Sequence, residues 1–186
     1  MLDGSVRTVS GRIKQLISVF RLTVSMETLR ISPRIGLEPI GTESSAEISD
    51  MAFPLLRDVY SNTPADVVEE FLRIYLTPEA IADQIRAGAV YAFIICDGER
   101  AGFMAYEVDC EGMHLSKLYL LPEFRGNGIG SAVIGYVEDR AREDGLDSVH
   151  LEVNEISPRT IAFYERLGYR ASGRMAQMRI VMRKDL

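Results

Sequence analysis

The chain contains the run Leu118-Tyr119-Leu120-Leu121-Pro122-Glu123-Phe124-Arg125-Gly126-Asn127-Gly128-Ile129-Gly130-Ser131, in which an apolar, strand-like segment leads into a turn dense in glycine. An amphipathic pattern typical of a helix follows at once. Glycine at alternate positions of the turn lets backbone N–H groups point inward, toward a ligand held at the N-terminus of the helix. The turn therefore predicts an anion site, and the anion that fits it best is a pyrophosphate.

The composition fits a folded chain of 186 residues with one domain, or with one domain and a tail. Its formal net charge is −6, which does not favour nucleic-acid binding through a basic surface. An acidic surface suits a cationic small molecule, although acidity is also the usual means of staying in solution. No apolar run is long enough to span a membrane, so no membrane partner is expected.

The cysteines and histidines give little sign of special chemistry. Cys96 and Cys110 both lie in apolar, strand-like runs, and we expect buried free thiols in a reducing compartment such as the cytoplasm. His114 and His150 are well apart, and no cysteine and histidine cluster has the spacing of a zinc site. The sequence therefore predicts no metal.

Residues 1–25 differ from the rest of the chain. They hold four basic residues against the single acid Asp3, and apolar residues recur at roughly helical spacing. One interpretation is a basic amphipathic helix that touches a membrane or a partner. The other, which we favour, is an upstream start with Met26 as the natural first residue. The predicted organisation is thus an extension over 1–25 and a single folded domain over 26–186.

From Met26 onward the pattern mixes helices and strands. Proline and glycine mark the ends of several helices, with Thr63 and Thr77 as expected N-caps, and Asp97-Gly98 predicts a hairpin turn. The expected strands cover a first short segment within 29–40, then 90–96, 101–108, 113–121 and 149–153, and one or two closing strands from 169 to about 182. The expected helices cover 46–60, two segments that end by Gly88, about 128–144, and a segment capped by Ser157.

Two other pyrophosphate-binding turns do not fit the glycine run. A nucleotide P-loop needs a lysine after its last glycine, and a dinucleotide turn needs G-x-G-x-x-G; neither is present here. The run Arg125-Gly126-Asn127-Gly128-Ile129-Gly130 instead matches Arg/Gln-x-x-Gly-x-Gly/Ala at every fixed position. It resembles the acyl-CoA motif of the GNAT superfamily of N-acetyltransferases. Downstream, 151–154 and Ile161-Ala162-Phe163-Tyr164-Glu165-Arg166-Leu167-Gly168-Tyr169 are similar to that family's later strand and helix.

The resemblance implies an α/β (α+β) GNAT fold. Its sheet would be mixed but mostly antiparallel, with about six or seven strands and helices on both faces. The strands at 113–121 and 149–153 would run parallel and splay apart in a V. In the family the pantetheine arm of acetyl-CoA lies in that V.

The resemblance also assigns residues to acetyl-CoA. Main-chain groups of Leu118 and Leu120 would pair with the pantetheine arm, and Arg125 would assist at the pyrophosphate. Where the family commonly has an asparagine that contacts the cofactor, this chain has Ser157, and Asn154 is a candidate substitute. The backbone N–H groups that would hold the pyrophosphate belong to Gly126, Asn127, Gly128, Ile129, Gly130 and Ser131.

For the chemical step, the resemblance places the Tyr164 hydroxyl near the sulfur as the general acid, whereas aromatic packing on the sheet is the simpler alternative. The general base stays open. Glu107 and His114 are candidates, and a chain of waters that ends at backbone carbonyls is an equal alternative.

The predicted function is direct transfer of an acetyl group from acetyl-CoA to a primary amine of a small molecule, without a covalent enzyme intermediate. The run 115–119 is loosely similar to members that acetylate polyamines. One alternative is acetylation of protein or peptide amino groups, and another is a non-catalytic acyl-CoA-binding module. Family members are often dimers, so a homodimer stays open.

Overall fold

The structure is a computed structural model that describes residues 28–175 and 179–186. The extension predicted over 1–25 and the start at Met26 lie outside the described residues. The described strands are β1 (Leu29–Arg30), β2 (Ile35–Ile40), β3 (Val90–Cys96), β4 (Glu99–Val108), β5 (Met113–Leu120), β6 (Ser148–Asn154), β7 (Arg170–Met175) and β8 (Arg179–Asp185). The described helices are α2 (Ser45–Val59), α3 (Ala65–Tyr75), α4 (Pro78–Ala87), α5 (Ile129–Glu143) and α6 (Pro158–Arg166), with 3-10 turns η1 (Thr42–Ser44) and η2 (Pro122–Phe124).

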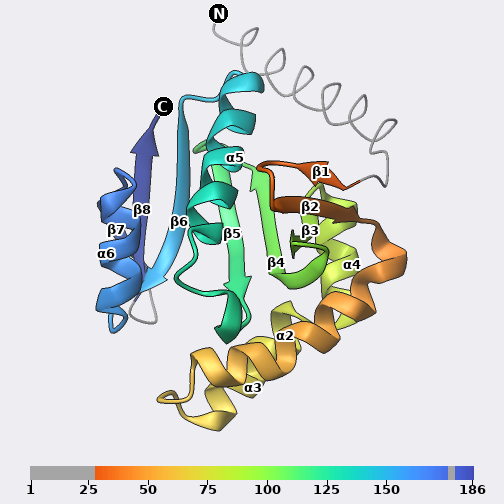
Figure 1. Cartoon of the computed structure of the whole chain (residues 1–186). Helices are drawn as coiled ribbons and strands as arrows, with labels where there is room; N and C mark the ends of the chain where they lie inside the picture. The colour runs from red at the N-terminus through yellow and green to blue at the C-terminus, as the bar shows by residue number, and fades with distance from the viewer. Residues whose placement is uncertain (1–27, 176–178) are drawn as a thin grey trace, which may run out of the picture.

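The eight described strands form one open sheet in the order β1-β2-β3-β4-β5-β6-β8-β7 (Figure 1). Every neighbouring pair is antiparallel except β5 and β6, which run parallel. The predicted mixed, mostly antiparallel sheet is confirmed. The strand expected within 29–40 is in fact a hairpin of two strands, and both closing strands form, which brings the count to eight.

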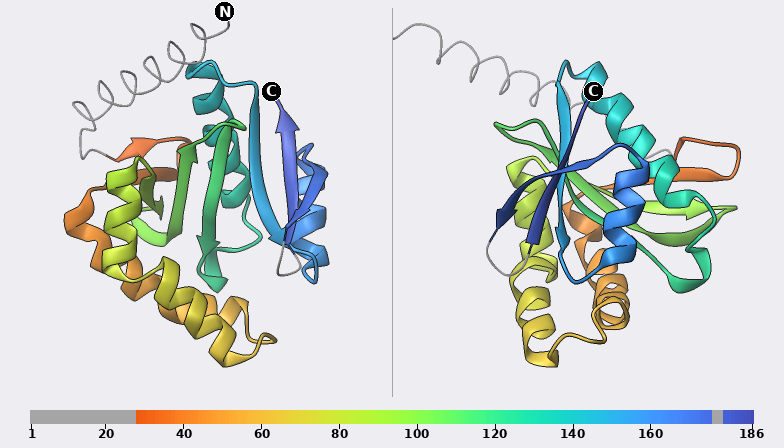
Figure 2. Two further views of the ribbon diagram at one scale, coloured as in Figure 1. Left: turned by 180° about the vertical axis from the view of Figure 1, so that it is seen from behind. Right: turned by 90° about the vertical axis from the view of Figure 1, so that its left-hand side faces the viewer.

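The parallel pair separates soon after it begins. β5 and β6 pair only at Met113 with Val149 and at His114 with His150. Beyond these positions β5 continues to Leu120 and β6 to Asn154, and the two strands diverge (Figures 1 and 2). The predicted V-shaped splay is therefore present, and it leaves one edge of β5 without a neighbouring strand.

Helices cover both faces of the sheet, as expected. Buried residues of α5 and α6 pack with one face, and those of α2, α3 and α4 form a second apolar cluster on the other. The side view in Figure 2 shows α5 and α6 on one side of the sheet and α4 on the other. α3 lies beyond the end of β5, where the V is wide (Figure 1). A pocket can therefore form between α3 and the diverging strands.

Most helix ends follow their sequence signals. Thr77 Oγ1 accepts a hydrogen bond from Ala80 N at the start of α4, and Gly88 ends the helix with a φ of 119°. The predicted cap at Thr63 is wrong, because α3 begins at Ala65 and Pro64 stands at the N-cap without a side-chain hydrogen bond. Ser157 does stand at the N-cap of α6, but its side chain makes no capping hydrogen bond.

The two cysteines differ in exposure. Cys96 is buried at the end of β3, as expected, whereas Cys110 is exposed. β4 ends at Val108, and the following turn is held by Asp109 Oδ1, which accepts from Glu111 N and Gly112 N. The strand thus ends before Cys110, which lies in the turn that follows and is exposed for that reason. Among the described helices, none is both long and apolar enough to cross a membrane.

Candidate active site

The glycine turn directs a row of backbone N–H groups out of the N-terminus of α5. Gly126 and Gly128 have φ angles of 79° and 77°, a left-handed conformation that favours glycine. The first hydrogen bond at this end of α5 runs from Ala132 N to Gly128 O over 3.1 Å. The N–H groups of Ile129, Gly130 and Ser131 precede that bond and have no acceptor inside the helix. Asn127 is exposed in the same turn.

Gly130 has a different reason to be glycine. A Cβ at this position would lie 3.2 Å from Phe163 Cζ, closer than an ordinary van der Waals contact. The glycine therefore allows α6 to pack tightly against the start of α5. This contact joins the two helices that carry the sequence motifs.

Arg125 lies at the end of β5. Its Nε donates to Leu120 O over 2.8 Å, and its guanidinium forms a 3.1 Å ion pair with Asp58 of α2. The side chain therefore fastens the start of the turn to the sheet and to α2. In this structure the Arg125 guanidinium is therefore engaged by the carbonyl of Leu120 and the carboxylate of Asp58.

The main chain of β5 presents polar groups to the gap in the V. Leu121 N donates to Ala101 O, so the alternating antiparallel ladder puts Leu118 and Leu120 in non-hydrogen-bonded pairs with β4. Their N–H and C=O groups consequently face away from β4, toward β6. The carbonyl of Leu120 is the one that Arg125 reaches.

A pocket of about 520 Å³ lies where the V opens toward α3. Its wall on the helical side is largely apolar and aromatic, and its floor comes from β5, β6 and β8. The residues that line it are Tyr60, Thr63, Asp66, Val67, Val68, Glu70, Phe71, Ile74, Tyr75, Ser116, Tyr119, Glu152, Asn154 and Arg179. The hydroxyls of Tyr60 and Tyr119 lie 3.4 Å apart at this wall.

An imidazole bridges two carboxylates beside the pocket. His114 Nδ1 lies 3.3 Å from Glu107 Oε1, and His114 Nε2 lies 3.1 Å from Glu152 Oε2. Burial opposes protonation of His114, but hydrogen bonds to the two carboxylates outweigh it and raise its pKa to about 9. The hydrogen bond from His114 in turn lowers the pKa of each carboxyl group. Only Glu152 of the three also lines the pocket.

A buried lysine lies on the same strand. Lys117 is 8% exposed, and its Nζ donates to Gln84 Oε1 of α4 over 3.1 Å. Burial lowers its pKa to about 8, against the attraction of Glu107 and Glu152. It follows Ser116, where the pairing of β4 and β5 shifts by one residue. The shift turns both Ser116 and Lys117 toward the α2–α4 face.

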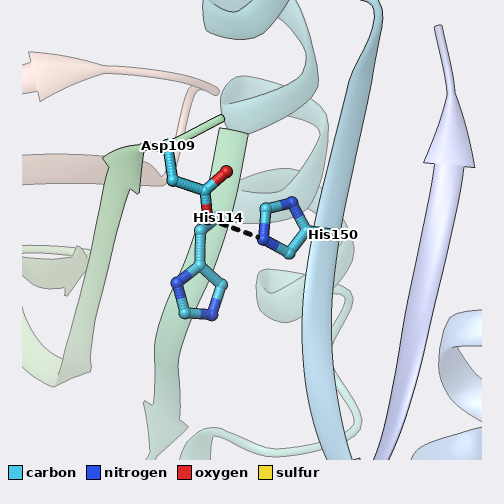
Figure 3. A group of neighbouring side chains, drawn as sticks. All are labelled: Asp109, His114 and His150. Atoms are coloured by element: carbon cyan, nitrogen blue, oxygen red, sulfur yellow. Dashed lines mark ion pairs between the residues drawn. The ribbon is translucent and has the colours of Figure 1, made fainter. Parts of the chain in front are cut away.

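Behind the imidazole bridge, His114 and His150 stack. Their ring centroids are 4.8 Å apart with an interplanar angle of 5°, and His150 Nε2 lies 3.1 Å from Asp109 (Figure 3). Ligand atoms of these three residues lie within 4.8 Å of one another, the spacing of a loose metal site. The nitrogen lone pairs of two stacked, parallel rings lie in parallel planes, however, so they do not converge on one metal ion. Both nitrogens of His114 also already face carboxylates. The cluster is better described as a stacked pair that supports His114.

Tyr164 lies on α6 and belongs to the apolar cluster between α5, α6 and the sheet. It is 8% exposed, and its ring packs edge-on against Phe163 and Tyr169. Burial raises the pKa of its hydroxyl, with a further contribution from Tyr60 of the pocket wall. The hydroxyl therefore stays protonated at neutral pH.

Comparison with known proteins places this arrangement in a family. Residues 53–169 match the family model "Acetyltransferase (GNAT) family". The chain belongs to the GNAT acetyltransferase family. The matched segment begins within α2 and ends at Tyr169, so it includes the glycine turn, the V and α6.

Among relatives of this GNAT chain, streptothricin acetyltransferase of Streptomyces lavendulae is 33% identical over 79 residues, which cover 41% of this chain and 38% of that one. Peptidyl-lysine N-acetyltransferase YjaB of Salmonella typhimurium is 27% identical over 96 residues, which cover 52% and 60%. The chain spans between half and two thirds of the length of the first curated relatives it matches.

A solved structure shares the fold of the GNAT chain over most of its length. The PaiA N-acetyltransferase of Thermoplasma acidophilum, crystallised with coenzyme A, superposes with a TM-score of 0.73 at 18% identity, over 82% of this chain and 99% of that one. At this identity the likeness concerns the fold alone.

Several sequence-predicted residues come together in the GNAT site and others do not. The turn, the Leu118 and Leu120 main chain and Tyr164 all border the gap. Asn154, predicted as a cofactor contact, lines the pocket on the face of the sheet opposite α5 and α6. Its Oδ1 accepts a hydrogen bond from Ile156 N. Glu152 and Arg179 were not predicted. Glu152 lies inside the downstream motif, at a polar position between two buried residues of β6.

Proposed function

We propose that this GNAT protein transfers an acetyl group from acetyl-CoA to the primary amine of a small molecule. One observation carries the proposal: the unpaired edge of β5 connects an anion-binding turn at one end to a pocket with a carboxylate floor at the other. A thioester held along that edge would lie between the turn and Glu152. Family membership supports acetyl-CoA as the donor.

For the donor, we propose that the N–H groups from Gly126 to Ser131 hold the pyrophosphate, helped by the dipole of α5. The pantetheine arm would pair with the main chain of Leu118 in the gap. Arg125 would act mainly by fixing the turn, because Leu120 O and Asp58 already engage it. Supporting this assignment, the edge of β5 offers hydrogen-bonding groups that no neighbouring strand satisfies.

For the acceptor, the array Glu107–His114–Glu152 carries a net charge of −1 when His114 is protonated. It therefore attracts an ammonium group and orients it at Glu152, the member that faces the pocket. Asp66 and Glu70 at the rim add negative charge, as a cationic acceptor such as a polyamine would require. A protonated His114 cannot serve as the general base, so Glu152 is the better candidate.

In the chemical step, the bound ammonium first loses a proton to solvent, and the neutral amine nitrogen then attacks the carbonyl carbon of the thioester. The carbon–sulfur bond breaks as the intermediate collapses. The nitrogen of that intermediate loses its proton to Glu152. The departing thiolate takes a proton from the Tyr164 hydroxyl, which then recovers one from water. The likeness of 161–169 to the family's later helix supports this role, and the Tyr164 hydroxyl, whose pKa burial raises, is protonated when the thiolate forms.

The test is release of free CoA thiol from acetyl-CoA, followed with and without acceptors. The acceptor panel contains small primary amines, polyamines and lysine-containing peptides. We expect release that depends on small amines and exceeds the rate without acceptor. Release with peptides alone would favour the peptide acetyltransferase. The likeness to a peptidyl-lysine acetyltransferase supports that alternative. Binding of acetyl-CoA without release in any mixture would indicate a binding module.

A further inference from the structure

One pocket residue has a charge that the proposed function does not use. Arg179 begins β8 and lines the acceptor pocket, where its guanidinium lies 5.4 Å from the centre of the Phe71 ring on α3. The side chain thus crosses from the sheet to the helical wall. It is partly buried, so its charge is less screened than that of an arginine on the open surface.

The guanidinium of Arg179 makes no ion pair with a carboxylate among residues 28–175 and 179–186. The acids around it are otherwise engaged or exposed. Glu152 is held by His114 at 3.1 Å, Glu70 pairs with Arg73 at 3.0 Å, and Asp66 is exposed at the rim. A partly buried guanidinium with five donors and an aromatic plane beneath it is a strong site for a planar anion such as a carboxylate.

Sheet register places this cation close to the proposed amine position. Arg179 pairs directly with Asn154, so Glu152 is its diagonal neighbour on the same face of β6 and β8. Diagonal neighbours in an antiparallel pair have Cβ atoms about 7–8 Å apart. A molecule whose ammonium and carboxylate are separated by one or two carbons can therefore contact Glu152 and Arg179 together.

The remaining wall suits an organic side chain. Val67, Phe71 and Ile74 recur on α3 at helical spacing and face the same pocket. Val67 and Ile74 are exposed to 54% and 44%, more than a wall without a ligand would favour. A side chain that leaves the same carbon as the ammonium would lie along this stripe, and its far end would reach Asp66 at the rim.

We propose that the acceptor is an α-amino acid or a close analogue, whose carboxylate binds Arg179 and whose amine is presented at Glu152. This inference rests on the proposed function, since it names the acceptor of that same site. It differs from the polyamine expectation, because a purely cationic acceptor would place positive charge beside an arginine that makes no ion pair among the described residues.

The test compares acceptors that differ only in the carboxylate. Each amino acid is compared with the amine that lacks its carboxylate: leucine with 3-methylbutylamine, phenylalanine with phenethylamine, and lysine with 1,5-diaminopentane. Each is also compared with its own amide, in which an uncharged carboxamide replaces the carboxylate. Spermidine completes the panel. We expect kcat/KM for each amino acid to exceed that of its amine and amide. Arg179→Gln should lower kcat/KM for the amino acids about 10- to 100-fold and leave the amines unchanged or improved. Arg179→Lys should restore much of the loss.

Arg174→Gln is the matched control, because Arg174 lies on β7 with its side chain 81% exposed and only a 3.9 Å ion pair to Glu155. It should leave the preference for amino acids intact. Equal use of amines and amino acids by the wild-type enzyme, or an equal loss for both in Arg179→Gln, would overturn the inference while the proposed function stands. Absence of acceptor-dependent release with every compound overturns both.

Discussion

At the scale of single residues, the Tyr164 hydroxyl can be removed with little change in the shape of the side chain, so its part in the chemistry can be tested alone. We expect Tyr164→Phe to lower kcat by a factor of about 100, within the usual range for general acid catalysis, and to change KM for acetyl-CoA little. Tyr169→Phe is the control, since that ring packs 5.7 Å from Tyr164 in the same cluster but belongs to no proposed step. Steady-state thiol release measures both. Unchanged turnover in Tyr164→Phe would refute the acid role.

Glu152 and Glu107 form a matched pair, because both contact His114 and only Glu152 lines the pocket. We expect Glu152→Gln to lower kcat/KM for the acceptor about 100-fold, the loss expected for a proton acceptor. Glu107→Gln should cost tenfold or less, since it alters only the support of the imidazole. Similar losses in the two variants would show that the array acts through its charge rather than through Glu152.

At this scale the sequence predicts some residues and misses others for a physical reason. The glycine turn is local, so neighbouring residues define it completely. Glu107, His114 and Glu152 lie on three strands and meet only through sheet register. A one-residue shift at Ser116 changes which side chains of β5 share a face, and alternation alone does not predict that shift. Arg179 comes from a strand further still along the chain.

At the scale of elements, the N-cap of α5 and the middle of that helix each hold a glycine, and the two have opposite expected responses to alanine. Gly128 has a φ of 77° at the N-cap, so Gly128→Ala should cost about 1–2 kcal/mol of folding free energy. Gly135 lies inside the helix, with open space where a Cβ would stand, so Gly135→Ala should add about 0.5–1 kcal/mol. Urea denaturation measures both changes.

The same pair tests the anion site. Gly128→Ala distorts the row of N–H groups and should raise the Kd for CoA, whereas Gly135→Ala should leave it unchanged. Titration calorimetry with CoA measures this difference. Equal CoA affinity in the two variants, with Gly128→Ala folded, would contradict the role proposed for the turn.

The elements themselves were largely predictable. The continuous apolar run that becomes β3 and the helical periodicity that becomes α5 both appear within a residue or two of their expected bounds. Errors fall where a local signal competes with tertiary structure. Thr63 carries a capping side chain, but Pro64 has an extended ψ of 134°, so it stands at the N-cap itself and α3 starts one residue later. The two strands within 29–40 could not be separated from sequence, because the bounds of β2 depend on its pairing with β3, which is distant in the chain.

At the scale of the whole molecule, stability should depend on pH through His114. Its folded pKa, raised to about 9, lies above the ordinary 6.5. Its contribution is therefore fully present below pH 6.5 and is lost as pH rises through 9, a change of roughly 3 kcal/mol. The carboxyl groups of Glu107 and Glu152 have lowered pKa values, so their contribution is lost as pH falls below their ordinary 4.5.

The free energy of unfolding should thus be highest between about pH 5 and 6.5 as far as this array is concerned. Urea denaturation at a series of pH values measures it. His114→Gln should flatten the alkaline decline, because the variant lacks the imidazole whose pKa the fold raises to about 9. The same decline in the variant and the wild type would show that other groups control stability.

The most direct measurement follows the acetyl group itself. The protein is incubated with acetyl-CoA that carries a deuterated acetyl group and with the amine panel, and the products are identified by mass spectrometry. We expect an amide that contains the labelled acetyl group, in equal amount to the free CoA. Free CoA with labelled acetate and no amide would mean hydrolysis, and intact acetyl-CoA with every acceptor would mean binding alone; either result contradicts transfer of the acetyl group to an amine.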